Sequence, residues 1–421
     1  MSNLKKHKFS DLYDVSSGIS SKPEQAGHGF PFLSFSSVFN NHFLPVPLPD
    51  LMDTSEKERE TYSIKQGDIF LTRTSETLDE LAMSSVAISD IENATYSGFL
   101  KRLRPKQSGT TYPKFMAFYL RSKLFRKTME NNAIMTLRAS FNEQIFSYLD
   151  LLLPEYDAQK NIGDLLFLLE EKIKLNNKIN AQLEAMAKLI YDYWFVQFDF
   201  PNTNGKPYKS SGGKMVYNEE LKREIPEGWN AGNIMQLANL LGGGTPKTTE
   251  DSYWNGSIPF FTPADAESNI YSLKTKANIT KDGLNNCSSR LYSKGTIFIT
   301  ARGTVGKINI ASRDMSMSQS CYALQGKEGI SSEFVYFYVD ELVHYIKSKA
   351  SGSIFKALVT NDFKFTPMTI PPTELIVQFT KLTKPMFEKL LINKIENNQL
   401  VELREWLLPS LMNGQVTVQE K

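Results

Sequence analysis

The pattern of apolar and polar positions changes once within each half of the chain. Up to about residue 150, short β-type runs such as residues 67–72 and 84–88 are separated by Gly, Pro, Asn and Ser. Residues 155–195 then contain no Pro, and their apolar positions follow a helical period. The second half repeats this change and ends in a helical stretch over residues 373–412, which Pro385 is expected to kink or restart. The pattern predicts two mixed α/β globules, each followed by one long helix.

Each predicted helix carries a stripe of residues that recur in steps of three and four, a spacing that places them on one face. The first stripe is Leu169, Ile173, Asn176, Asn180, Leu183, Met186 and Ile190, and the second is Met386, Leu390, Asn393, Asn397, Leu400, Leu403 and Leu407. Both stripes hold two asparagines at the same places. A polar residue in an apolar seam costs stability but fixes the register, because it is satisfied only opposite a matching partner. We therefore predict a coiled coil between the helices; packing of each helix on its own globule is the alternative.

Periodicity alone does not distinguish parallel from antiparallel pairing. Antiparallel pairing within one chain would relate the two globules by an approximate two-fold axis, and we favour it for that reason. A helix of about 35 residues is roughly 50 Å long, so the pair is expected to hold the globules apart.

The chain also repeats itself, which strengthens this arrangement. With a shift of about 217 to 228 residues, several segments of the second half match the first half in the same order. Residues 67–72 match 295–300, 115–120 match 334–339, and 151–154 match 368–371, while Leu12, Gly18 and Lys22 match Leu237, Gly243 and Lys247. We predict an internal duplication and an α+β fold of two tandem globules and two long helices. The expected segments are residues 1–154, 155–198, 199–371 with a turn-rich linker at about 201–224, and 372–421.

Composition narrows the class of protein. The chain has 421 residues, is 41% hydrophobic and carries a net charge of only +2. No apolar run reaches the roughly 18 residues of a membrane span, and the first residues lead into no apolar signal region. Two cysteines and four scattered histidines offer neither a disulfide framework nor a metal site. A cytoplasmic protein without a membrane association is expected.

Local charge is more informative than net charge. Residues 96–140 contain ten basic side chains and one acidic side chain, interleaved with aromatic residues and amides, which favours a phosphate-contacting face. A solvated surface is the alternative. Residues 285–313 contain five basic and no acidic side chains around the loop 300–307, whose glycines would let main-chain amides approach a phosphate while Arg302 reaches a base edge. A tight hairpin without a ligand is the competing interpretation of that loop.

Catalytic motifs are missing. Residues 242–248 lack the spacing of a phosphate-binding loop and are interpreted as a turn. Asp265 and Glu267 could suggest a nuclease, but Asn269 stands where its lysine would be expected, so we interpret the acids as surface residues. No glycine-rich dinucleotide motif and no Asn-Pro-Pro-[Tyr/Phe] methyltransferase tetrapeptide occur. The sequence predicts no catalytic site, no metal and no cofactor in this chain.

The layout resembles the specificity subunit of type I restriction-modification systems over nearly the whole chain. The residues that carry the resemblance are Ile225-Pro226-Glu227-Gly228-Trp229, Gly244-Thr245-Pro246, Tyr253-Trp254, Gly256, Ile258-Pro259-Phe260, Gly295-Thr296-Ile297-Phe298, Arg302-Gly303, Ser318-Gln319, and the helix entries Leu153-Pro154 and Ile370-Pro371-Pro372. The first globule departs from the pattern. It has no Pro-x-Gly-Trp opening, and Arg73 follows its strand one position early.

The resemblance implies that the globules are two target-recognition domains, each of which reads one half of a bipartite, asymmetric double-stranded DNA site. The helices would set the spacer and dock two methyltransferase subunits, which bind S-adenosylmethionine and methylate adenine; motor-nuclease restriction subunits would complete the enzyme. With the charge pattern, it gives candidate DNA-binding residues Lys22, Thr72, Arg73, Thr74, Lys101, Arg102, Arg104, Arg138, Lys247, Arg302, Thr304, Lys307 and Gln319.

Two other functions compete with a non-catalytic specificity subunit. A stand-alone DNA-binding or regulatory protein would use the same globules without methyltransferase partners, and co-purification separates the two. A nuclease or methyltransferase would need the motifs that are missing.

Overall fold

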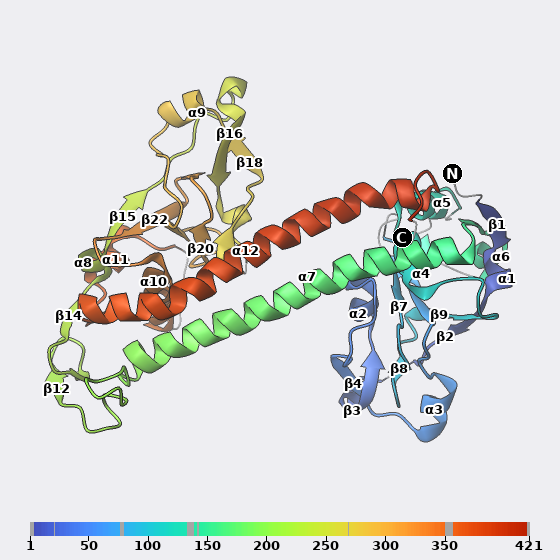
Figure 1. The fold of residues 1–421 in the computed structure, drawn as a ribbon, viewed down its shortest axis with the longest axis horizontal. Helices are drawn as coiled ribbons and strands as arrows, with labels where there is room; N and C mark the ends of the chain where they lie inside the picture. The colour runs from blue at the N-terminus through green and yellow to red at the C-terminus, as the bar shows by residue number, and fades with distance from the viewer. Residues whose placement is uncertain are drawn as a thin grey trace. The chain divides into compact units, whose positions relative to one another are not determined.

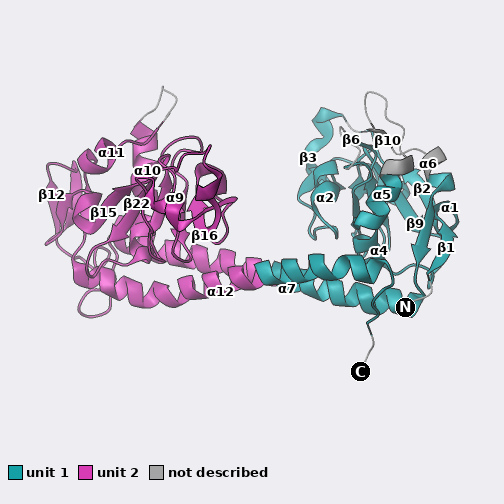
Figure 2. Cartoon of the chain, turned by 90° about the horizontal axis from the view of Figure 1, so that it is seen from above, with its two compact units in different colours: residues 1–174, 398–421 teal, residues 175–397 magenta. Residues whose placement is uncertain are grey.

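The computed structural model describes residues 4–20, 22–75, 80–132, 139–140, 143–267, 269–349 and 357–418. The chain divides into two compact units (Figure 2). Unit 1 is Met1–Lys174 with Asn398–Lys421, and unit 2 is Leu175–Asn397. Each unit therefore combines one globule with parts of both long helices, whereas the sequence division treats the helices as separate segments.

Unit 1 is built around two sheets and several short helices (Figure 1). Its elements are β1 (Lys5–Lys8), α1 (Phe9–Leu12), β2 (Tyr13–Ser17), β3 (Ala26–Leu33), α2 (Phe35–Asn40), β4 (Asp50–Met52), α3 (Glu56–Thr61), β5 (Ile69–Thr72), β6 (Thr74–Ser75), β7 (Ser84–Val86), β8 (Thr95–Tyr96), β9 (Leu100–Pro105), α4 (Pro113–Tyr119), α5 (Lys123–Asn132), β10 (Ala139–Ser140), α6 (Glu143–Tyr148), β11 (Asp150–Leu153) and the start of α7 (Tyr156–Tyr191). The strand orders are β2-β9-β5-β7 and β4-β3-β8, with the pairs β1-β11 and β6-β10.

Unit 2 repeats this plan. After α7 and one π-helical turn (Asp192–Val196), its elements are β12 (Met215–Asn218), β13 (Arg223–Pro226), β14 (Asn230–Gly232), α8 (Ile234–Leu237), β15 (Ala238–Gly242), β16 (Trp254–Phe261), β17 (Tyr271–Ser272), β18 (Ala277–Ile279), α9 (Lys281–Asn285), β19 (Ile297–Thr300), β20 (Ile308–Ala311), β21 (Ser316–Met317), β22 (Cys321–Gly326), α10 (Ser332–Lys349), α11 (Thr360–Phe365), β23 (Met368–Ile370) and α12 (Thr373–Met412). Its strand orders are β15-β22-β19-β20-β17 and β18-β16-β21, with the pairs β14-β23 and β12-β13.

The duplication predicted from sequence is confirmed by this topology. Strands β2, β9, β5 and β7 have the same order and the same antiparallel pairing as β15, β22, β19 and β20. Likewise β3 pairs antiparallel with β4 and parallel with β8, as β16 does with β18 and β21. The matched glycines Gly18 and Gly243 make the same close approach, since a Cβ on either would lie 2.2–2.3 Å from main-chain oxygens of Ser97 or Ser318.

The ends of the long helices pack on the globules. Ile162 and Leu166 of α7 and Leu411 of α12 belong to the core of unit 1. Gly163 permits this contact, because a Cβ there would lie 2.6 Å from the main-chain nitrogen of Phe115 in α4. In unit 2 the corresponding core joins Tyr191 of α7 and several α12 residues to the globule. Both helices are long and continuous, and α12 runs through Pro385 without a break, so Pro385 does not start the helix afresh.

The contacts between the helices show antiparallel pairing, as predicted (Figure 1). In unit 2, Asn176 Nδ2 donates to Asn397 Oδ1 at 2.9 Å, and Asn393 Nδ2 donates to Asn180 Oδ1 at 2.8 Å. In unit 1, Arg404 pairs with Glu170. Residue numbers therefore fall along α12 as they rise along α7. Asn176, Asn393 and Asn397 are buried and Asn180 is partly buried, and hydrogen bonds between opposed asparagines are an arrangement that fixes a register.

Two stripe residues do not lie in the seam. Met186 is 51% exposed and Leu403, its counterpart in the repeat, is 42% exposed, so their assignment to the seam is wrong. A straight helix has 3.6 residues per turn, and a 3.5-residue stripe drifts around it. By residue 187 the buried position has shifted by one, to Ala187.

The segment expected as a linker is folded onto unit 2. Asp199 accepts hydrogen bonds from the main-chain nitrogen and hydroxyl of Ser210. The Phe200 ring stacks on Tyr208 at 4.6 Å and on Trp229 at 5.4 Å. Aromatic burial thus attaches a polar, turn-rich stretch to the globule that follows it.

Candidate nucleic-acid interface

Several candidate residues of unit 2 gather at one edge of its five-stranded sheet. Strands β15 and β19 end at this edge, and β20 and β22 begin there, because neighbouring strands are antiparallel. The connecting loops contact each other: the hydroxyl of Thr245 donates to Gln319, and the main-chain nitrogen of Ala301 donates to the oxygen of Ser320 at 2.8 Å. The side chains of Lys247, Arg302, Thr304 and Gln319 are exposed there. We call these four residues the unit 2 edge.

The loop from Thr300 to Lys307 is a tight turn. The buried Thr300 hydroxyl donates to the main-chain oxygen of Thr304 at 2.5 Å and accepts from the main-chain nitrogen of Lys307 at 3.0 Å. Gly303 and Gly306 have φ angles of 77° and 79°, which a residue with a side chain rarely adopts. The Lys307 ammonium donates inward to the oxygen of Ala266 at 3.1 Å. The loop is therefore a tight hairpin that leaves the Arg302 side chain exposed.

Unit 1 has the equivalent edge with different side chains. The main-chain nitrogen of Arg73 donates to the oxygen of Phe99 at 2.9 Å, as Ala301 does to Ser320. Arg73 therefore corresponds to Ala301, and Thr74 takes the place of Arg302. Lys22, Arg73 and Phe99 are exposed, Phe99 by 68%, and Thr74 is partly exposed. Arg138 lies outside the described residues.

Four further candidates in unit 1 are engaged inside the globule. Lys101 is only 8% exposed and its ammonium donates to Ser17 Oγ at 2.9 Å. Arg102 donates to the main-chain oxygen of Ser63 at 2.8 Å, and Arg104 makes two hydrogen bonds, 2.7 and 2.6 Å, to the carboxylate of Asp68. The fourth, buried Thr72, accepts from the main-chain nitrogen of Met83 (2.9 Å). A phosphate-contacting role for these four does not fit this geometry, because Lys101 and Thr72 are buried and the two arginines already bind Ser63 and Asp68.

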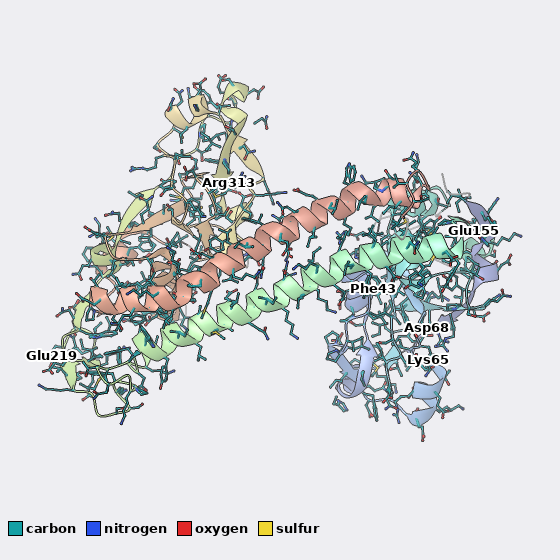
Figure 3. All side chains as sticks on the ribbon, viewed as in Figure 1. Phe43, Lys65, Asp68, Glu155, Glu219 and Arg313 are labelled. Atoms are coloured by element: carbon teal, nitrogen blue, oxygen red, sulfur yellow. The ribbon has the colours of Figure 1, made fainter. Side chains whose placement is uncertain are left out.

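The Arg104–Asp68 pair gives a stability prediction (Asp68 is labelled in Figure 3). Asp68 is fully buried, so Arg104→Ala would leave an unpaired buried carboxylate. We expect a loss of about 3 kcal/mol in the free energy of unfolding, measured in urea, with an unchanged salt dependence of DNA binding. Arg73→Ala is the matched control: stability should hold, and the salt dependence should flatten by roughly 0.9 log units for each phosphate that the variant no longer neutralises. If Arg104→Ala instead kept its stability and flattened the salt dependence, Arg104 would belong to the DNA-binding face.

The acids considered for a nuclease have structural partners. Asp265 is buried, not on the surface as expected; it accepts from Thr262 and from the main-chain nitrogen of Lys276 at 2.7 Å. Glu267 accepts from Asn269 and Lys394. Within the described ranges, no group of three His, Cys, Asp or Glu side chains could hold a metal ion. Among the residues that the structure describes, no helix is long and apolar enough to cross a membrane.

Comparisons with known proteins agree with this layout. Residues 1–185 and 226–402 match the family described as type I restriction modification DNA specificity domain. The type I restriction enzyme HindI specificity subunit of Haemophilus influenzae is 25% identical over an alignment 461 positions long, which covers 96% of this chain and 98% of that protein. The MjaIX specificity subunit of Methanocaldococcus jannaschii is 31% identical over 183 residues, 42% of each protein.

A solved structure shares the fold. The crystal structure of the S subunit of a type I restriction-modification system from M. genitalium has a TM-score of 0.66 with 14% identity, and covers 100% of this chain and 97% of that one. The two family matches fall one on each repeat, in agreement with the duplicated topology. The chain belongs to the family of type I restriction-modification DNA specificity domains and is, as predicted, a non-catalytic specificity subunit.

Proposed function

We propose that this subunit recognises a bipartite, asymmetric site on double-stranded DNA, with one half-site for each unit. The observation that carries the proposal is the repeated edge. The same strands present Arg73, Thr74 and Phe99 in unit 1 and the unit 2 edge around Arg302 in unit 2. Base edges are recognised by the side chains that the protein presents to them. Two different sets of side chains on the same arrangement of strands would therefore recognise unrelated half-sites.

The proposal includes partners that carry the chemistry. Two methyltransferase subunits, which would hold S-adenosylmethionine, dock on the long helices, and motor-nuclease subunits complete the restriction enzyme. The helices support this with a second apolar stripe, exposed and separate from the seam. It consists of Leu175, Met186 and Leu189 on α7 and of their counterparts Ile392, Leu403 and Trp406 on α12. Large apolar side chains repeated on an exposed face are typical of a protein–protein contact.

Arg302→Ala tests the DNA-reading role. In the complex with methyltransferase, the recognised site is first found by mapping methylated adenines, and affinity is then measured for that site and for single-base variants. We expect the substitution to cost about 1–3 kcal/mol at one half-site and to relax its base preference, because an arginine that binds a guanine edge carries that much discrimination.

The matched control is Arg313→Ala. Arg313 is exposed just beyond the other end of β20, away from the edge (Figure 3), and its loss should leave both half-sites unchanged. Equal weakening on all sequences would assign Arg302 to a phosphate. An unchanged affinity would remove the unit 2 edge from the interface.

A further inference from the structure

The loop that carries Arg302 rests on a neighbouring segment. We call residues 300–307 the recognition loop and residues 262–267 the support segment. Thr304 Oγ1 donates to the main-chain oxygen of Pro263 at 3.3 Å, and Lys307 Nζ donates to that of Ala266 at 3.1 Å. Because both bonds end on main-chain atoms of one short segment, the position of the recognition loop depends on the position of the support segment.

The support segment is internally fixed and attached to α12. Asp265 closes it by accepting from the main-chain nitrogen of Thr262 at 2.9 Å. At its other end, Glu267 Oε2 accepts from Lys394 Nζ at 3.1 Å and from Asn269 Nδ2 at 2.8 Å. Lys394 projects from α12 and its side chain is only 23% exposed. Burial raises the pKa of Glu267, but these two hydrogen bonds outweigh it and lower the pKa, so the carboxylate is charged at neutral pH.

In unit 1 the chain after β3 is held by other side chains. After β3, the Arg121 guanidinium donates to the main-chain oxygens of Val38, Phe39 and Asn41, at 2.7, 2.9 and 3.0 Å. The next residue, His42, lies 3.8 Å from Glu170 of α7, which pairs with Arg404 of α12. Phe43, labelled in Figure 3, packs edge-on against Phe167 of α7 at 5.0 Å.

The His42 contact is not an ion pair. Burial, with Arg121 and Arg404 nearby, lowers the pKa of His42 to about 3, so the ring is neutral at physiological pH. In unit 1, hydrogen bonds from Arg121 therefore hold this part of the chain to the globule, and the Phe43–Phe167 contact packs it on α7. In unit 2 an ion pair joins the support segment to α12.

We propose that the Glu267–Lys394 ion pair is a positioning contact for DNA recognition. It fixes the support segment to α12 and so holds the recognition loop in the geometry that reads bases, without either residue touching DNA. The inference rests on the proposed function of the unit 2 edge. Groups that read a ligand must be held within about 0.5 Å of their productive position. Val305 packs the recognition loop on the core of unit 2, and the ion pair adds a polar attachment to α12 through the support segment.

The test uses single and reciprocal substitutions in the full-length chain. Glu267→Gln and Lys394→Gln each remove the ion pair, and Glu267→Lys with Lys394→Glu restores it with the charges exchanged. Hydrogen exchange is measured at the amides of Gly306 and Lys307, which donate to Thr300 within the recognition loop. We expect exchange to rise roughly two- to fivefold in each single variant and to return near its original rate in the exchanged pair. Lys389→Gln, at an exposed lysine of the same helix, should change nothing.

The same variants are then assayed for DNA binding in the complex with methyltransferase. We expect a roughly two- to fivefold loss of affinity for the cognate site in the single variants and recovery in the exchanged pair. Faster exchange with unchanged affinity would make the contact merely structural and overturn the inference. Unchanged exchange and unchanged binding in Glu267→Gln and Lys394→Gln would also overturn the inference. If Arg302→Ala still impairs recognition in that case, the proposed function stands. An inert Arg302→Ala would instead overturn the proposed function.

Discussion

Exchanging residues 225–365 for the matching segment of another specificity subunit should replace one half of the recognised DNA site and leave the other half and the spacer intact. The exchanged segment holds the entire unit 2 edge and the five-stranded and three-stranded sheets of that unit. Both long helices stay in place, and so does unit 1. The new half-site should be the one that the donor segment reads in its own protein, because base contacts come from the loops rather than from the frame.

The choice of donor follows from the core of unit 2. Phe334 and Phe337 of α10 pack against Tyr191 of α7 and against Phe379 and Phe387 of α12. A donor with aromatic residues at both α10 positions keeps this packing and avoids a cavity that would cost about 3–5 kcal/mol for each missing ring.

The outcome is found by mapping methylated adenines with the exchanged chain and its methyltransferase. Exchange of residues 1–154 is the reciprocal control and should replace the other half alone. A single exchange that altered both halves would show that the units do not read DNA independently. A chain that no longer directs methylation although its unfolding transition is unchanged would also contradict modular reading.

The long helices and the duplication are predictable because their patterns are local and repeated. Residues 373–412 carry apolar positions at a helical period, and the structure has α12 over the same residues. Pro385 alone predicts an interruption, but the helix is held by Phe379 and Phe387 on either side, both fully buried. Tertiary packing here offsets the local cost of a proline in a helix.

The basic segment of unit 1 is misleading in the sequence because its partners are distant along the chain. A run of positive charge indicates a phosphate-binding face only if the charges are free. Arg104 is instead paired with Asp68, which immediately precedes the neighbouring strand β5, and Arg102 reaches Ser63. Burial of a carboxylate that far away leaves no local mark in the sequence. The match of residues 67–72 with 295–300 already places Thr74 opposite Arg302, and the main-chain bonds of the two repeats agree.

The outer stripe of the helices is present in the sequence, but a search for the seam alone misses it. Met186 and Leu403 fit a 3.5-residue spacing, which assigns them to the seam. Leu189 and Trp406, three residues further along each helix, occupy matching positions outside that spacing. Comparison of the two helices for repeated apolar residues outside the seam finds the second stripe.

Replacing Leu189 or Trp406 by Glu should each remove one methyltransferase subunit from the complex, and the double variant should remove both. The two side chains are 65% and 74% exposed and take the same place in the two repeats, so each would contribute to one of two equivalent docking contacts. Burying such a side chain stabilises a contact by about 1.5–3 kcal/mol, and an unpaired carboxylate in its place adds a desolvation cost. The sum is about 4 kcal/mol, roughly a thousandfold in affinity.

Native mass spectrometry of the co-expressed subunits measures how many methyltransferase subunits are bound. We expect two with the original chain, one with each single variant and none with the double variant. Val216→Glu is the matched control, because Val216 is an exposed apolar side chain on the β12–β13 hairpin and belongs to neither long helix, and two subunits should remain bound. Since all three positions are exposed, the substitutions should leave the unfolding transition in place, which separates loss of docking from loss of folding. Two bound subunits in the double variant would place docking elsewhere on the chain. Loss of both subunits in each single variant would show that the two contacts form only together, because independent equivalent sites must fail one at a time.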